Sequence, residues 1–145
     1  MLYLASASPR RRALLEQAGV PFVVVRSDVQ EHFQKGMAPK SVAATLAARK
    51  AWAAPVRPGP GEAVLGADTV VALEGRALGK PSDAEEAAAM LRALSGRWHR
   101  VYTGFCLRAQ EQAVCGVART DVRFYPLSNE EIRRYVETGE PMDKA

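Results

Sequence analysis

The apolar positions of the chain alternate between two spacings in its first half. Short runs rich in Val, Ile, Leu and Phe predict strands, and apolar residues three or four apart predict helices. These expected elements cover residues 2–5, 9–18, 22–25, 39–54 and 63–73. Ser8 followed by Pro9 is a typical helix start, and Gly19 is a typical helix end. Because alternating strands and helices form βαβ units, this half predicts a partly parallel sheet.

The second half has longer strand patterns and two further helices. The expected elements are a hairpin around Glu74-Gly75, a helix near 84–94, strands 98–108 and 113–125, and a helix that ends near Gly139. Ser82 to Glu85 resembles a capping box for the first of these helices, and Ser128 to Glu131 resembles one for the second. The whole pattern predicts an α/β protein, a three-layer fold around a mixed sheet, with one domain over residues 1–145.

Composition and charge narrow the classes of protein. The 145 residues are 48% hydrophobic and 25% charged, as in ordinary globular domains, and no apolar run reaches the length of a membrane helix. The first residues lack the order of charge and apolar run of a secretory signal, so we expect a cytoplasmic protein without membrane contact. The net charge of +4 is spread along the chain, and aromatic residues make up 7%. A small anion such as a nucleotide therefore fits better than a stable nucleic-acid complex.

Several familiar catalytic and metal motifs are missing from the sequence. Cys106 and Cys115 lack the spacing and histidine partners of a zinc site, and we expect reduced structural thiols. His32 and His99 are isolated, so no catalytic triad can be argued from them. The chain also has no Walker-type glycine-rich loop and no dinucleotide fingerprint.

The segment between the first strand and the first helix is a candidate phosphate-binding loop. Ser6 and Ser8 lie there, and Arg10 and Arg11 follow in the first turn of the helix, where free backbone N–H groups and the helix dipole attract anions. Arginine side chains can bind phosphate oxygens through two donors at once. An ordinary helix cap flanked by solvated arginines is the alternative interpretation of the same residues.

Four charged residues are candidates for the chemistry. Asp68 interrupts an apolar strand run, where a carboxylate is costly to bury unless it meets a metal, a lysine or hydrogen-bond donors. Glu31 in a polar loop, Lys50 in a helix and Lys80 between Gly79 and Pro81 complete the set. Taken singly, Glu31 and Lys50 also fit solvated surface charges.

Seven short motifs occur in one order along the chain. They are Leu4-Ala5-Ser6-Ala7-Ser8-Pro9-Arg10-Arg11, Glu31, Ala48-Arg49-Lys50-Ala51, Gly66-Ala67-Asp68-Thr69-Val70-Val71, Gly79-Lys80-Pro81, Leu94-Ser95-Gly96 with His99 and Val101, and Gly139-Glu140-Pro141. Together they resemble the Maf family of nucleoside triphosphate pyrophosphatases over the whole chain. The resemblance implies a fold similar to the inosine triphosphatases, a homodimer, and hydrolysis of a nucleoside triphosphate to monophosphate and pyrophosphate.

The resemblance also implies roles for individual residues. Asp68 matches the proton acceptor, and Glu31, Lys50 and Lys80 match the other essential charged positions. The substrate-binding set is Ser6, Ser8, Arg10, Arg11 and Thr69. A divalent cation, Mg²⁺ or Mn²⁺, is implied as well, with Glu31 and Asp68 as its candidate ligands. Whether Asp68 deprotonates water or binds the metal that activates it stays open at this point.

Two positions distinguish the branches of the family. Arg10 and Thr69 resemble the branch that prefers dTTP and UTP, whereas the branch for 7-methylated GTP has tryptophan and glutamine there. Members of the family continue past this point with a Gly-Ala-Tyr-Gly-Ile-Gln-Gly segment, so we expect that the C-terminal part is missing. The family was first associated with inhibition of septum formation. A non-enzymatic regulator that binds a nucleotide or a division protein is therefore the alternative function.

Overall fold

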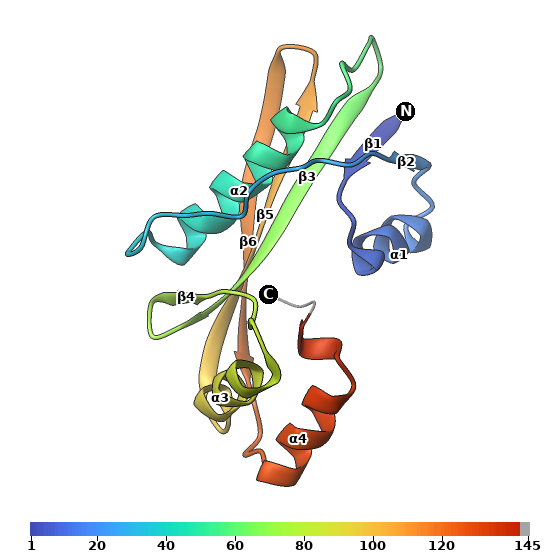
Figure 1. The fold of residues 1–145 in the computed structure, drawn as a ribbon. Coiled ribbons are helices and arrows are strands. Elements are labelled where there is room, and N and C mark those ends of the chain that lie inside the picture. Colours follow the sequence, from blue (N-terminus) through green and yellow to red (C-terminus); the bar gives the residue numbers. More distant parts are fainter. Residues whose placement is uncertain (143–145) are drawn as a thin grey trace.

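The computed structural model describes residues 1–142, and its elements follow the predicted order (Figure 1). The strands are β1 (Leu2–Ala5), β2 (Phe22–Val24), β3 (Ala63–Leu73), β4 (Arg76–Leu78), β5 (Trp98–Ala109) and β6 (Gln112–Arg123). The helices are α1 (Pro9–Gln17), α2 (Pro39–Ala53), α3 (Ala84–Leu94) and α4 (Asn129–Glu137), followed by a 3₁₀ turn (Glu140–Met142). Within residues 1–142, no helix combines the length and the hydropathy of a membrane span.

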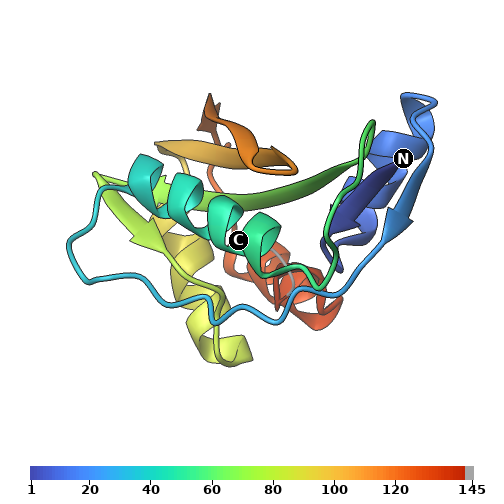
Figure 2. The ribbon, with the colours of Figure 1, turned by 90° about the horizontal axis from the view of Figure 1, so that it is seen from above.

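The strands form one mixed sheet in the order β2-β1-β3-β5-β6, and β4 adds to the end of β3. β1 is parallel to both β2 and β3, whereas β3, β5 and β6 are antiparallel to one another. The chain moves outward from β1 to β2 through α1 and returns to β3 through α2. Because such crossovers are right-handed, the two helices lie on opposite faces of the sheet. Figure 2 shows α2 along one face and α1 at the other, which confirms the predicted three layers.

Two glycines allow α2 to pack directly on the sheet. A Cβ at Gly66 in β3 would lie 2.5 Å from the backbone nitrogen of Ala51, and one at Gly104 in β5 would lie 2.5 Å from the carbonyl carbon of Ala43. The helix backbone therefore touches the sheet where both strands lack side chains. Beside these contacts, a cluster of buried apolar residues joins α2 to β3: Val42, Ala43, Leu46 and Val70.

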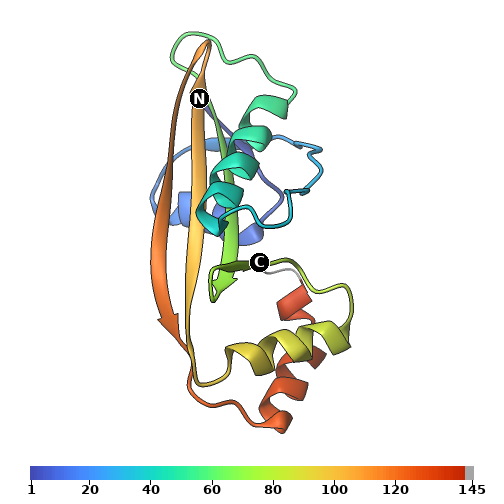
Figure 3. The ribbon, with the colours of Figure 1, turned by 90° about the vertical axis from the view of Figure 1, so that its left-hand side faces the viewer.

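The remaining helices pack together at the other end of the sheet. Figure 3 shows α3 and α4 side by side beyond the end of α2, on the same side of the sheet as that helix. The prediction for the start of α4 is confirmed, since Ser128 and Glu131 form a reciprocal capping box. The prediction for α3 is wrong by one residue. Its N-cap is Asp83, whose carboxylate accepts from the backbone nitrogen of Glu86 at 2.7 Å, because this carboxylate reaches the free donor directly.

Candidate active site

Lys50 lies at the centre of a charged cluster on the α2 face of the sheet. Its Nζ lies 2.8 Å from Asp68 Oδ1 in β3 and 3.1 Å from Glu31 Oε1 in the loop before α2. The side chains of Lys50 and Asp68 are only 13% and 11% exposed. The close packing at Gly66 explains the first contact, because Gly66 and Asp68 are two apart on β3 and face the same helix. The lysine thus holds two carboxylates from distant parts of the chain together.

Lys80 completes this cluster from the segment after β4. Its Nζ lies 3.7 Å from Glu31 Oε2, and both side chains are substantially exposed. Burial acts to raise the pKa of Glu31, but the hydrogen bond and charge of Lys50, with the charges of Lys80 and Arg11, bring it below its usual range. Glu31 is therefore a firmly ionised carboxylate and a weak base.

A second group of polar side chains surrounds the loop between β1 and α1. Ser6 Oγ accepts from the backbone nitrogen of Ser8 at 3.1 Å and from Arg11 Nη1 at 3.2 Å. Arg11 Nη2 donates to Thr69 Oγ1 in β3 at 3.3 Å. Ser8 is the N-cap of α1, as predicted, and Pro9 occupies the first turn. The first turn of α1 is thus tied to β3 through one guanidinium group.

The strand order explains why the two groups are near each other. β1 pairs with β3 only as far as Gly66, and β4 begins to pair with β3 at Val71. Within residues 1–142, the edge of β3 between these points has no neighbouring strand on the β1 side. In open α/β sheets, ligands bind at the carboxyl ends of parallel strands, at the point where successive crossovers run in opposite directions. Here that point is the carboxyl end of β1, next to the unpaired part of β3. Asp68 and Thr69 are adjacent on this part of β3, so their side chains point to opposite faces of the sheet.

Electrostatic coupling supports the same arrangement. Burial lowers the pKa of Arg11, whereas the carboxylates of Asp68 and Glu31 act in the opposite direction and the charge of Arg10 adds to the lowering. Arg11 therefore lies within range of both carboxylates in the first cluster. The structure brings together the predicted residues Ser6, Ser8, Arg11, Glu31, Lys50, Asp68, Thr69 and Lys80, and Arg10 lies beside them on an exposed position.

Two carboxylates are available to a metal ion in this cluster. Among residues 1–142, no group of three or more His, Cys, Asp or Glu side chains is close enough to hold one. Magnesium, however, is commonly bound by one or two carboxylates together with substrate phosphates and water. Asp68 and Glu31 face one another around the Lys50 ammonium, so the donor set fits a divalent ion of this kind.

Sequence reasoning missed three residues that support the site. Thr103 in β5 lies 3.1 Å from Thr69, oxygen to oxygen. Ser27 donates to the carbonyl of Lys50 at 2.8 Å, and the buried Arg108 donates to the carbonyls of Ala51 at 3.0 Å and Val56 at 2.8 Å. The last turn of α2 is thus held from both sides. No local pattern indicates these contacts, because each joins residues 23 or more positions apart.

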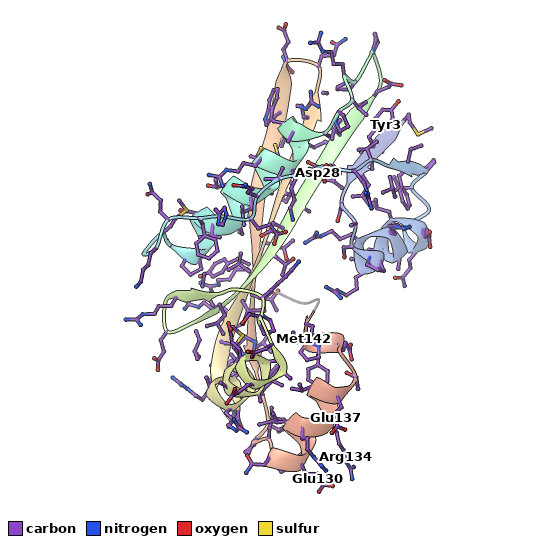
Figure 4. The ribbon with its side chains drawn as sticks, in the orientation of Figure 1. Tyr3, Asp28, Glu130, Arg134, Glu137 and Met142 are labelled. Carbon is purple, nitrogen blue, oxygen red and sulfur yellow. The ribbon has the colours of Figure 1, made fainter. Side chains whose placement is uncertain are left out.

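Several other features of the structure lie away from the site. His99 is buried against Phe124, with ring centroids 4.8 Å apart, and its Nδ1 has no hydrogen-bond partner among the described residues. Figure 4 shows Glu130, Arg134 and Glu137 on α4, far from α1 and α2. Two surface hollows also lie elsewhere, one between α3 and α4 and one beside Trp98. His32 follows Glu31 in the sequence, and its backbone carbonyl accepts a hydrogen bond from Arg49 Nη1 at 2.6 Å.

Comparison with known proteins identifies the family. The family model for Maf-like proteins matches residues 1–145. The chain belongs to the Maf family. A dTTP/UTP pyrophosphatase of Symbiobacterium thermophilum is 53% identical over 144 residues, which are 99% of this chain and 74% of that protein. A dTTP/UTP pyrophosphatase of Bacillus cereus is 47% identical over 99% of this chain and 75% of its own length. Both of these relatives are nucleoside triphosphate pyrophosphatases, so the family contains enzymes of this kind.

One solved structure shares the fold at low sequence identity. The Ham1 protein of Staphylococcus aureus superposes with a TM-score of 0.51 and 15% identity, covering 83% of this chain and 69% of that one. At this identity the likeness concerns the fold alone. It agrees with the α/β architecture that the Maf resemblance implied.

Proposed function

We propose that the protein hydrolyses the pyrimidine nucleoside triphosphates dTTP and UTP to the monophosphate and pyrophosphate. The observation that carries the proposal is the cluster in which Lys50 joins Asp68 and Glu31 beside Arg11 and Lys80. Carboxylates can orient and deprotonate water, and cations can stabilise a departing pyrophosphate. The names of the Maf relatives support the choice of substrate.

In the proposed reaction, a water oxygen bonds to the α phosphorus while the bond to the oxygen bridging the α and β phosphates breaks. One proton of the water passes to a carboxylate, and pyrophosphate leaves with the electron pair. We assign the stabilisation of the phosphate charges to three cations of this cluster, Arg11, Lys80 and Lys50. The N-terminus of α1 adds backbone donors and a favourable dipole for the same anions.

We assign different roles to the two carboxylates. Glu31 has a lowered pKa and a 42% exposed side chain, so it is a poor proton acceptor and a good ligand for a cation. Asp68 is the more deeply buried of the two and is fixed by a 2.8 Å contact with Lys50. We propose Asp68 as the proton acceptor because it matches that position in the Maf resemblance and because Lys50 holds its carboxylate in place beside the open edge of β3. A divalent Mg²⁺ or Mn²⁺ ion would have Glu31 as its main protein ligand, with one oxygen of Asp68 as a second candidate and the other oxygen left to accept the proton; such an ion would lower the pKa of water and screen phosphate charge.

Replacement of Asp68 by Asn tests the catalytic role. The change removes the charge but keeps the shape and one acceptor oxygen for Lys50, which also retains its contact with Glu31. We expect pyrophosphate release from dTTP to fall about 100-fold or more, the range for loss of a general base. The free energy of unfolding should change by less than about 2 kcal/mol, below the cost of breaking a buried pair outright.

The control is Asp121→Asn, at an exposed carboxylate of β6 that contacts Arg100 and Arg119 instead. It should leave both turnover and stability near those of the wild type. A D68N protein that melts early yet turns over normally per folded molecule would remove Asp68 from the mechanism. Orthophosphate as the product would refute the site of cleavage, and rapid hydrolysis of 7-methyl-GTP would refute the substrate preference. Nucleotide binding without any release of pyrophosphate would favour the regulatory function.

We also propose that the protein acts as a homodimer in the cytoplasm, where its nucleotide substrates occur. The homodimer rests on the resemblance to the Maf family. Light scattering coupled to size exclusion would measure the mass in solution. A mass of one chain at micromolar concentration would refute the dimer without affecting the assignment of Asp68.

A further inference from the structure

Residues 25–38 carry Glu31 and contain no helix or strand. This segment, the Glu31 loop, runs from the end of β2 to the start of α2, and Figure 1 shows it crossing α2 on the way. Its two ends are held by apolar packing, since Val25 and Met37 pack against buried clusters of the core. Glu31 lies near the middle of the loop, so polar contacts have to fix the position of its carboxylate.

Three hydrogen bonds join this loop to the last turns of α2. Ser27 Oγ donates to the carbonyl of Lys50 at 2.8 Å, and Lys50 Nζ donates to Glu31 Oε1 at 3.1 Å. The third and shortest comes from Arg49, whose Nη1 donates to the backbone carbonyl of His32 at 2.6 Å. Successive side chains of a helix project about 100° apart, so Lys50 can reach the sheet while its neighbour Arg49 reaches the loop.

The contacts of the Glu31 carboxylate are the ones that a nucleotide would disturb. They are made by Lys50 and, at 3.7 Å, by Lys80, and the proposed function assigns both lysines to the phosphate charges. Phosphate oxygens would compete with Glu31 for the same ammonium groups. The hydrogen bond from Arg49 involves neither lysine, because it ends on the backbone of the residue next to Glu31. It therefore stays available when phosphates occupy the site.

We propose that Arg49 is a positioning residue that fixes the backbone beside Glu31 and so keeps its carboxylate in the site while Lys50 and Lys80 bind phosphate. This inference rests on the proposed hydrolysis of a nucleoside triphosphate and extends it to a residue outside the charged cluster. Arg49 is exposed and reaches the Glu31 loop at its backbone. Its role is to act through Glu31, without contact to the substrate.

The experiment compares Arg49→Ala with Arg49→Lys, of which only the second keeps a charged donor. Hydrogen exchange of the backbone amides of residues 28–34, followed by mass spectrometry, measures how firmly the Glu31 loop is held. We expect exchange in R49A to be about three- to tenfold faster, which corresponds to one exposed hydrogen bond. The kcat for pyrophosphate release from dTTP should fall by a similar factor, whereas KM should change less because the cations that bind phosphate are untouched. R49K should lie closer to the wild type in both measurements.

Arg134→Ala is the matched control. Arg134 is an exposed arginine on α4, far from α2, and its partner there is Glu130. Its replacement should leave both the exchange of the Glu31 loop and the turnover unchanged. Melting temperatures of all three variants should stay close to that of the wild type, since each replaced side chain is exposed.

Exchange in R49A at the wild-type rate would overturn the proposal, because Arg49 would then not hold the Glu31 loop. Faster exchange with an unchanged kcat would overturn it as well, because the position of Glu31 would not depend on this contact. Equal effects of R49A and R49K would also contradict a role for the hydrogen bond. A wild type that does not cleave dTTP would refute the proposed hydrolysis instead, and faster exchange in R49A would still support the contact between Arg49 and the loop.

Discussion

Gly66→Ala tests whether the approach of α2 to β3 builds the site. The added Cβ would lie 2.5 Å from the backbone nitrogen of Ala51 and closer still to the carbonyl oxygen of Ala47. Ordinary contacts of a Cβ begin near 3.4 Å, so α2 has to move by about 1 Å or the strand has to bend. Both neighbours are backbone atoms, and no change of rotamer can relieve the clash.

Overpacking a core costs about 1–3 kcal/mol, and we expect the upper end of that range for a clash with backbone. For a domain of this size, about 3 kcal/mol corresponds to a fall in melting temperature of roughly 6–12 °C. Activity should fall further than the folded fraction, because Lys50 lies on the displaced turn of α2. A displacement of about 1 Å at catalytic groups can lower the rate about 100-fold.

The assay combines thermal unfolding followed by circular dichroism with pyrophosphate release per folded molecule. Gly79→Ala is the matched control for stability, since a Cβ there meets nothing within 4 Å and its φ is not positive. It should leave the melting temperature unchanged or raise it slightly. A G66A protein that melts with the wild type and keeps full activity would show that the helix does not rest on Gly66, and the account of how Lys50 reaches Asp68 would fail.

Two further predictions concern residues outside the site. In the folded protein, Cys115 should react with iodoacetamide near neutral pH while Cys106 should not, because Cys106 is buried and burial, with the neighbouring Cys115, raises its pKa. Mass spectrometry of tryptic peptides locates the modified thiol, and equal labelling of both would contradict the burial of Cys106. Burial lowers the pKa of His99 in the folded protein. As the pH drops below about 6.5, the imidazole is therefore protonated more readily in the unfolded chain than in the folded protein, and the free energy of unfolding should fall. Urea unfolding between pH 7.5 and 5 measures this free energy, which should depend less steeply on pH in His99→Phe than in the wild type. Equal slopes against pH would show that His99 does not cause the loss of stability.

The sequence determined the local structure of this protein almost completely. Hydrophobic spacing predicted the strands and helices, and the residues that cap α1 and α4 marked where those helices begin. These features depend on neighbours within a few positions, which is why they can be read along the chain. The predicted cap of α3 was wrong by one residue, because Ser82 and Asp83 are adjacent and both types of residue can cap a helix.

The sequence also provided the identity of the charged residues, but not their partners. Asp68 was noticed because a carboxylate in an apolar strand needs a compensating group, yet nothing local named Lys50 as that group. Lys50 meets Asp68 because α2 packs against Gly66, and Thr103 meets Thr69 because of the register of β3 with β5. Register and helix packing are contacts between distant segments, so only the tertiary structure decided which of the candidate residues meet at the open edge of β3.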